Sequence, residues 1–193
     1  MKVRDVVLMG LLAAIGTLSA HLVAIPVGGA KVFPVQHAIN VIAGVFLGPG
    51  PGILVAFAVG LLRNILGTGT VLAFPGGMVG AFLAGYAYRV TQRAWSAAIG
   101  EVFGTGILGA IIAYPVAKLV LGKPVAALAY VIPFSLSSVA GAVLGLILVL
   151  ALRNTAFERP PGHDSRSMGP AVTTTGEKAL KSGDTARTGG DRI

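Results

Sequence analysis

The stretch VAGAVLGLILVLAL, residues 139–152, contains only Ala, Gly, Val, Leu and Ile. The same few residue types dominate the chain from Val6 to Leu152, where Glu101 is the only carboxylate. A charged side chain costs roughly several kcal/mol at the centre of a bilayer, so charges are rare where protein faces lipid. The sequence therefore predicts an integral membrane protein.

Composition supports the same class for most of the 193 residues. Hydrophobic residues make up 54% of the chain and charged residues 11%, whereas an ordinary soluble domain has about 25% charged residues. Because a spanning helix needs about 20 apolar residues, residues 1–153 predict an all-α polytopic bundle of six transmembrane helices that forms a substrate-binding domain. Residues 154–193 are rich in Gly, Thr, Ser and charged residues and predict a disordered cytoplasmic tail.

Clusters of proline and glycine mark the expected ends of the helices. With six alternating spans, the basic residues that precede the first helix, follow the fourth and end the sixth fall on one side. The positive-inside bias makes this side the cytoplasm, and it accounts for the net charge of +8 without nucleic acid. The expected helices cover residues 6–23, 35–47, 53–66, 78–90, 97–121 and 126–152, with a loop at 26–34 and a break at 48–52.

Polar side chains inside the apolar body come from separate segments that this topology brings to the outer end of the bundle. We therefore expect a polar cavity that is open to the outside and closed below by apolar helix. Arg63 has two alternatives: it receives an anionic or electron-rich ligand group, or it extends to the outer headgroups. The candidate substrate-binding residues are Phe33, Gln36, His37, Asn40, Arg63, Asn64, Phe74, Tyr114 and Ser137.

Glu101 is expected about one turn inside the cytoplasmic end of the fifth helix. Gly100 and Gly104 flank it and allow close approach of a neighbouring helix. Because that depth does not match the outer cavity, the sequence favours a structural or partner-facing role for this carboxylate.

Motifs for catalysis are missing from the sequence. It has no nucleophile elbow, phosphate-binding loop, paired carboxylates or cysteine, and His21, His37 and His163 are far apart. We therefore expect no catalytic residue, no metal site, no cofactor and no ATP hydrolysis by the chain itself. A small membrane enzyme is accordingly disfavoured.

Three runs of sequence resemble the ThiW family: PVGGAKVFPVQHAIN at 26–40, GVFLGP at 44–49 and LRNILGTGTVLAFPG at 62–76. This family comprises predicted substrate-binding (S) components of energy-coupling factor (ECF) transporters for thiamine precursors of the hydroxyethylthiazole type. The resemblance covers about residues 5–152. It implies a six-helix protein of the prokaryotic plasma membrane with both termini in the cytoplasm.

The resemblance also implies how such a protein works. An S component captures a vitamin in an outward cavity that the loop after the first helix closes, and a membrane T component and two ATPases supply the energy. A small-residue face on the first helix docks on the T component. Here Gly10 and Ala14 occupy that face, where the common pattern has Ala at both positions.

The ligand and the mode of transport leave alternatives open. Thiamine-binding relatives stack their ligand on aromatic residues that include Trp, whereas the only Trp here, Trp95, falls on the cytoplasmic side. The smaller thiazole half is therefore expected rather than whole thiamine. The alternatives are an S component for another vitamin and a self-sufficient carrier of small solutes.

Overall fold

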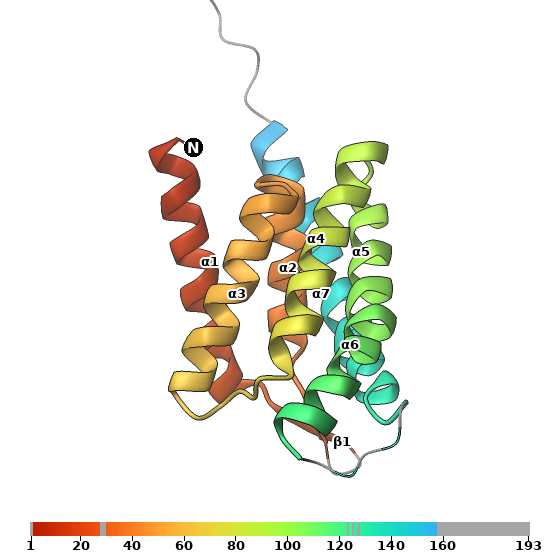
Figure 1. Cartoon of the computed structure of the whole chain (residues 1–193). Coiled ribbons are helices and arrows are strands. Elements are labelled where there is room, and N and C mark those ends of the chain that lie inside the picture. The colour runs from red at the N-terminus through yellow and green to blue at the C-terminus, as the bar shows by residue number, and fades with distance from the viewer. Residues whose placement is uncertain (1, 28–29, 123, 125, 127, 158–193) are drawn as a thin grey trace, which may run out of the picture. The chain divides into compact units, whose positions relative to one another are not determined.

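The computed structural model describes residues 2–157 except 28, 29, 123, 125 and 127 (Figure 1). The described chain is almost entirely helical, and α5, η1, α6 and η2 follow one another without interruption as one long segment. The elements are α1 Val3–Leu22, β1 Ile25–Val27, β2 Ala30–Val32, α2 Pro34–Phe46, α3 Pro49–Ile65, α4 Ala73–Thr91, α5 Ala94–Phe103, the π-helix η1 Gly104–Gly109, α6 Ala110–Pro115, the π-helix η2 Val116–Val120 and α7 Val131–Phe157.

This architecture confirms the prediction of an all-α membrane protein. Three segments are long and apolar enough to cross a bilayer, namely Val3–Ala20, Ala94–Val120 and Val131–Arg153. The apolar helices α2 and α3 are shorter. Six spans therefore remain a prediction, although six helical segments stand side by side in the described part (Figure 1).

Two helices begin four or more residues earlier than the sequence analysis predicted. α3 starts at Pro49 rather than residue 53, and α4 starts at Ala73 rather than residue 78. Proline is tolerated in the first turn, where a backbone N–H has no partner inside the helix in any case. The predicted break at 48–52 therefore shrinks to Gly48, whose φ of +88° favours glycine.

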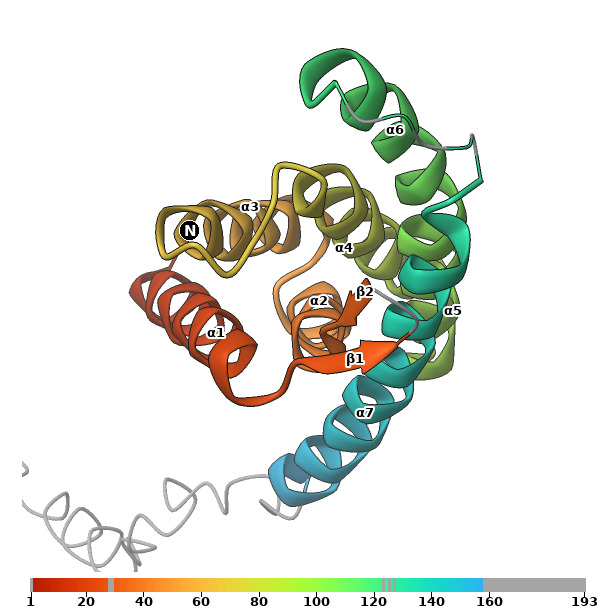
Figure 2. The same ribbon diagram turned by 90° about the horizontal axis from the view of Figure 1, so that it is seen from below.

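The predicted loop at 26–34 is in part a small β-hairpin. β1 and β2 pair in antiparallel fashion, with Ile25 opposite Val32 and Pro26 opposite Lys31. Seen from below, the hairpin lies across the end of the bundle next to the start of α2 (Figure 2). It therefore covers part of that end, which we call the hairpin end.

The short helix α2 stands at the centre of the bundle, surrounded by α1, α3, α4, α5 and α7 (Figure 2). Its residues are buried from Gln36 to Val45. A helix of 13 residues rises only about 20 Å, less than the roughly 30 Å of hydrocarbon in a bilayer. The short length is compatible with a membrane because protein rather than lipid surrounds this helix.

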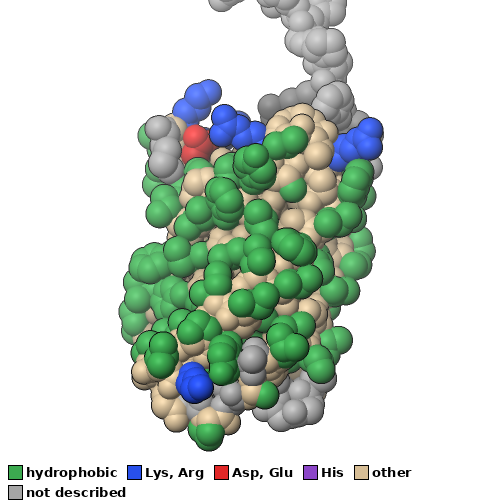
Figure 3. All heavy atoms as spheres, turned by 45° about the vertical axis from the view of Figure 1, so that its right-hand side comes forward, with side chains coloured by type: hydrophobic (Ala, Val, Ile, Leu, Met, Phe, Trp, Pro, Cys, Tyr) green, Lys and Arg blue, Asp and Glu red, His purple; other side chains and the backbone are tan. Residues whose placement is uncertain are grey.

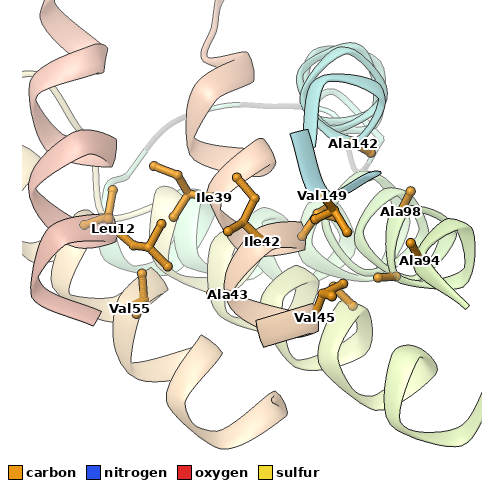
Figure 4. Close-up of a cluster of buried hydrophobic side chains, with 14 of the residues drawn as sticks. Leu12, Ile39, Ile42, Ala43, Val45, Val55, Ala94, Ala98, Ala142 and Val149 are labelled. Carbon is orange, nitrogen blue, oxygen red and sulfur yellow. The ribbon is translucent and has the colours of Figure 1, made fainter. Parts of the chain in front are cut away.

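Small residues bring the helices close together. The main hydrophobic cluster draws on α1, α2, α3, α4, α5 and α7, and many of its members are Ala or Val (Figure 4). A Cβ added at Gly44 of α2 would lie 2.7 Å from the backbone nitrogen of Gly85 in α4. Such close backbone approach is how helices associate in lipid, where hydrophobic burial between them is weak.

Basic residues gather at the end opposite the hairpin, above a side face on which many hydrophobic side chains are exposed (Figure 3). The start of α1, the α4–α5 connection and the end of α7 meet there (Figure 1). Arg153 of α7 donates a hydrogen bond to the hydroxyl of Tyr88 in α4. We call this the basic end; its assignment to the cytoplasm stays a prediction.

The predicted boundary between the membrane domain and the tail falls within a helix. α7 continues to Phe157, four residues beyond the predicted limit at 153. Residues 158–193, on which the expectation of a disordered tail rests, lie outside the described residues.

Candidate functional site

A cavity of about 730 Å³ opens at the hairpin end. This volume is within the roughly 300–1,000 Å³ typical of sites for small molecules. The wall is built by the end of α1 and its connection to β1, by β2, α2, the end of α3, the α3–α4 loop, α4 and η1, and by the start of α7. Its lining residues with large or polar side chains are Lys31, Phe33, Gln36, His37, Arg63, Thr68, Thr70, Leu72, Thr105, Tyr130, Phe134 and Ser137.

Arg63 of α3 is turned into the protein near the mouth of the cavity. Only 2% of its surface is exposed, and its guanidinium carbon lies 3.9 Å from the centre of the Phe33 ring. Nη2 donates to the carbonyl of Thr68 at 3.0 Å and Nη1 donates to Oε1 of Gln36. This burial excludes the alternative in which Arg63 extends to the headgroups.

The floor of the cavity holds a buried acid and a histidine. Nδ1 of His37 lies 2.7 Å from Oε1 of Glu101, which is fully buried. The same oxygen receives the amide of Asn40 at 3.2 Å and the hydroxyl of Thr105 at 2.8 Å. Glu101 is not among the lining residues, in agreement with its predicted depth, but it lies beneath them and holds His37 and Thr105 in place.

Helix geometry explains why Asn40 and Glu101 meet. Asn40 is six residues from the end of α2 and Glu101 is seven residues from the start of α5, both counted from the basic end. At about 1.5 Å per residue, these positions are about 9 and 10 Å from that end, so the two side chains lie at one level. A full-length second helix would have placed Asn40 much farther away.

Glycines in α4 make room for the polar side chains of the floor. A Cβ added at Gly80 would lie 2.4 Å from Oε2 of Glu101, and one added at Gly77 would lie 3.1 Å from Nε2 of Gln36. Gly76 and Gly77 also line the cavity, and their carbonyls accept hydrogen bonds from Thr105 and Asn40. α4 thus meets the site with backbone rather than side chains.

The family model described as thiamine-precursor transporter protein (ThiW) matches residues 6–155. The chain belongs to the ThiW family. The resemblance seen in the sequence is thereby confirmed, and the family identifies the chain as a membrane transport protein for a thiamine precursor. No curated protein and no solved structure gives a significant match.

In this ThiW-family chain, five of the nine predicted site residues line the cavity: Phe33, Gln36, His37, Arg63 and Ser137. A sixth, Asn40, lies just below, where its amide also donates to the carbonyl of Gly77 at 3.1 Å. The convergence of residues from separate segments is therefore found in the structure. Contact of these residues with a ligand remains a prediction.

The other three predicted residues do not reach the cavity wall. The amide of Asn64 bonds the carbonyls of Gly60 at 2.7 Å and Thr70 at 3.1 Å, so it holds the α3–α4 loop. Phe74 packs against Phe57 and Gly60 on α3. Tyr114 lies on α6, where the ammonium of Lys118 is 5.9 Å from its ring, so the prediction of Tyr114 as a cavity residue was wrong.

Sequence reasoning missed three lining residues that a ThiW-family site could use. Thr105 follows Glu101 by four positions, so both lie on one helix face. Tyr130 and Phe134 have the same spacing and precede Ser137. The spacing of each pair was the available signal. The observed α7 begins at Val131 rather than at the expected residue 126, so Tyr130 lies just before the helix.

The predicted docking residues Gly10 and Ala14 are both exposed on α1. A Cβ added at Gly10 would meet no atom within 4 Å. Their face is thus free of contacts within the described residues, and docking of a partner there remains a prediction.

Proposed function

We propose that this chain is the substrate-binding component of an ECF-type transporter and captures a hydroxyethylthiazole-like thiamine precursor from outside the cell. The observation that carries the proposal is the cavity itself. It combines aromatic walls with a few polar groups at two levels, the pattern of a site for a small heterocycle. Membership of the ThiW family supports the class of ligand.

The two polar levels fit the two ends of such a ligand. The aromatic side chains of Phe33, Tyr130 and Phe134 line the cavity and offer surfaces for a planar ring. Arg63 near the mouth donates to a hydroxyl through N–H groups that its two protein bonds leave unused. The ring then lies deeper, towards His37 and Thr105.

The hairpin is placed to close over a bound ligand. The backbone N–H of Phe33, directly after β2, donates to the hydroxyl of Ser137 in α7 at 2.9 Å. This bond ties the hairpin to the opposite wall of the cavity. Lys31 of β2 also lines the cavity, so movement of the hairpin would open or cover the mouth.

The remaining parts of the proposal concern the partners and the orientation. The exposed small face with Gly10 and Ala14 suits close packing of a helix from a T component, which two ATPases would drive. The basic end would face the cytoplasm by the positive-inside bias. Both the start of α1 and the end of α7 lie at that end (Figure 1).

Calorimetric titration of the purified full-length chain with 4-methyl-5-(2-hydroxyethyl)thiazole tests the binding role. We expect saturable binding that Arg63→Ala and Gln36→Ala each weaken about tenfold or more, because each removes a hydrogen-bonding side chain from the wall. Tyr114→Phe is the matched control outside the cavity. Wild-type affinity in both wall variants would reject the site.

A transport assay separates the proposal from a self-sufficient carrier. Proteoliposomes that hold the chain alone should bind the thiazole without accumulating it. Accumulation should require the T component, both ATPases and ATP. Uptake by the chain alone would contradict the S-component role and favour the carrier.

A further inference from the structure

The floor of the cavity carries a hydrogen-bond donor whose existence depends on Glu101. We propose that the His37–Glu101 pair presents Nε2–H of His37 to the ligand, and that the site thereby selects a ring with an unsubstituted, unprotonated nitrogen and rejects an N-alkylated thiazolium. This inference rests on the proposed function and assigns the atom that recognises the thiazole nitrogen.

The contacts of Glu101 define its charge. Oε1 lies within hydrogen-bonding distance of the imidazole of His37, the amide of Asn40 and the hydroxyl of Thr105, whose single hydrogen is shared with the carbonyl of Gly76. These contacts gather hydrogen-bond donors around one oxygen of the carboxyl group. Oε2 is buried and has no hydrogen-bond partner among the described residues, so the charge is compensated only around Oε1.

A buried carboxylate in the bilayer interior needs a cation in contact with it. His37 is the side chain that forms this contact, at 2.7 Å, and the other close donors are neutral. The imidazolium form gives a pair without net charge. In that form, Nδ1–H donates to Glu101 and Nε2 also carries a hydrogen.

Nε2 is the ring atom left to meet a ligand. His37 lines the cavity, and Nε2 forms no hydrogen bond within the part of the chain that the structure describes. Among the described residues, the side-chain polar atoms that are buried and lack a hydrogen-bond partner are Asn40 Oδ1, Arg63 Nε and Glu101 Oε2. Nε2 is not among them, so it remains accessible.

The ligand chemistry follows from this donor. The ring nitrogen of a neutral thiazole has an in-plane lone pair that accepts a charge-assisted hydrogen bond. A thiazolium nitrogen bears an alkyl group, has no lone pair, and adds a positive charge beside an imidazolium. Glu101 acts here as a positioning residue, because it works through His37 rather than by touching the ligand.

Three ligands of nearly equal shape test the inference on the wild-type chain by calorimetry: the hydroxyethylthiazole, its thiophene analogue without the nitrogen, and its N-methylthiazolium analogue. We expect the thiophene to bind about ten- to a hundredfold more weakly than the thiazole, since it leaves the buried donor unpaired. The thiazolium should bind more weakly still.

Glu101→Gln gives a sharper test. The hydroxyl of Thr105 and the amide of Asn40 would hold the Gln oxygen in the place of Oε1, and neutral His37 would donate to it from Nδ1. Nε2 then becomes an acceptor, so the preference for thiazole over thiophene should fall to within about threefold. A thiazolone analogue with a ring N–H should bind this variant more tightly than it binds wild type.

Ser137→Ala is the matched control at the mouth and should weaken the thiazole and the thiophene by the same factor. Wild-type binding of thiazole and thiophene within about threefold of each other would overturn the inference and leave the proposed function standing. An unchanged thiazole-to-thiophene ratio in a folded Glu101→Gln variant would also overturn it. Failure of the wild type to bind any thiazole would overturn the proposed function, and this inference with it.

Discussion

The two halves of the bundle use the same helices in different ways. Towards the basic end, α2 and α5 contribute small apolar residues such as Val41, Ala43 and Ala97, which are completely buried. Towards the hairpin end, the same two helical segments contribute His37 and Thr105 to a hollow. The two halves therefore have different roles. Close packing in the basic half fixes the helices that hold the polar groups of the hairpin half.

The largest expected effect comes from disturbing the packed half. In Gly44→Leu, the new side chain would collide with the backbone of α4, because even a Cβ would lie 2.7 Å from Gly85 N. We expect a loss of about 3 kcal/mol or more in the free energy of unfolding, seen in thermal melts in detergent. Gly10→Ala, which meets no atom within 4 Å, should leave the melting temperature unchanged. Equal stability of the two variants would disprove the packing role of Gly44.

A substitution at the border between the two halves should lower the free energy of unfolding less. Asn40→Ala removes donors to Glu101 and to the carbonyl of Gly77, so we expect a loss of about 1–3 kcal/mol in the free energy of unfolding. Because Asn40 does not line the cavity, the affinity for thiazole should fall less than in Arg63→Ala. Parallel melts and titrations of both variants check this order, and a reversed order would make Asn40 a ligand contact.

The smallest effect on affinity and stability is expected from a substitution in the hairpin half that lies outside the cavity. Tyr114→Phe removes a hydroxyl that does not line the cavity, and its ring keeps the contact with Lys118. Affinity and melting temperature should both stay within measurement error of the wild type. A tenfold loss of affinity would show that α6 approaches the ligand in the bound state.

The sequence predicted the fold class because hydropathy reports directly on a lipid environment. It also predicted that polar residues of α2, α3 and α7 converge, because helix order fixes which ends meet. The hairpin was not predicted because strands of three residues are too short to show an alternation of apolar and polar residues.

The details of the site depended on quantities that sequence does not display. The contacts of Glu101 with His37 and Asn40 depend on the position of α2 at the bundle centre, which only tertiary packing reveals (Figure 2). Tyr114 shares its residue type with the lining residue Tyr130, and Asn64 has a polar side chain like the lining residues, but local contacts set the direction of both side chains. Prediction from residue type and depth alone therefore included residues that do not line the cavity.

Labelling of single cysteines tests the central claim, an outward cavity above a packed half, most directly, since the chain contains no cysteine of its own. Ser137 lines the cavity, whereas Ser96 is buried near the basic end and donates to the carbonyl of Arg93. We predict that a small membrane-impermeant thiol reagent added to intact cells modifies Ser137→Cys and that hydroxyethylthiazole slows this reaction. Ser96→Cys should not react from outside. Modification of Ser137→Cys only in inside-out vesicles, or without protection by the thiazole, would contradict the account.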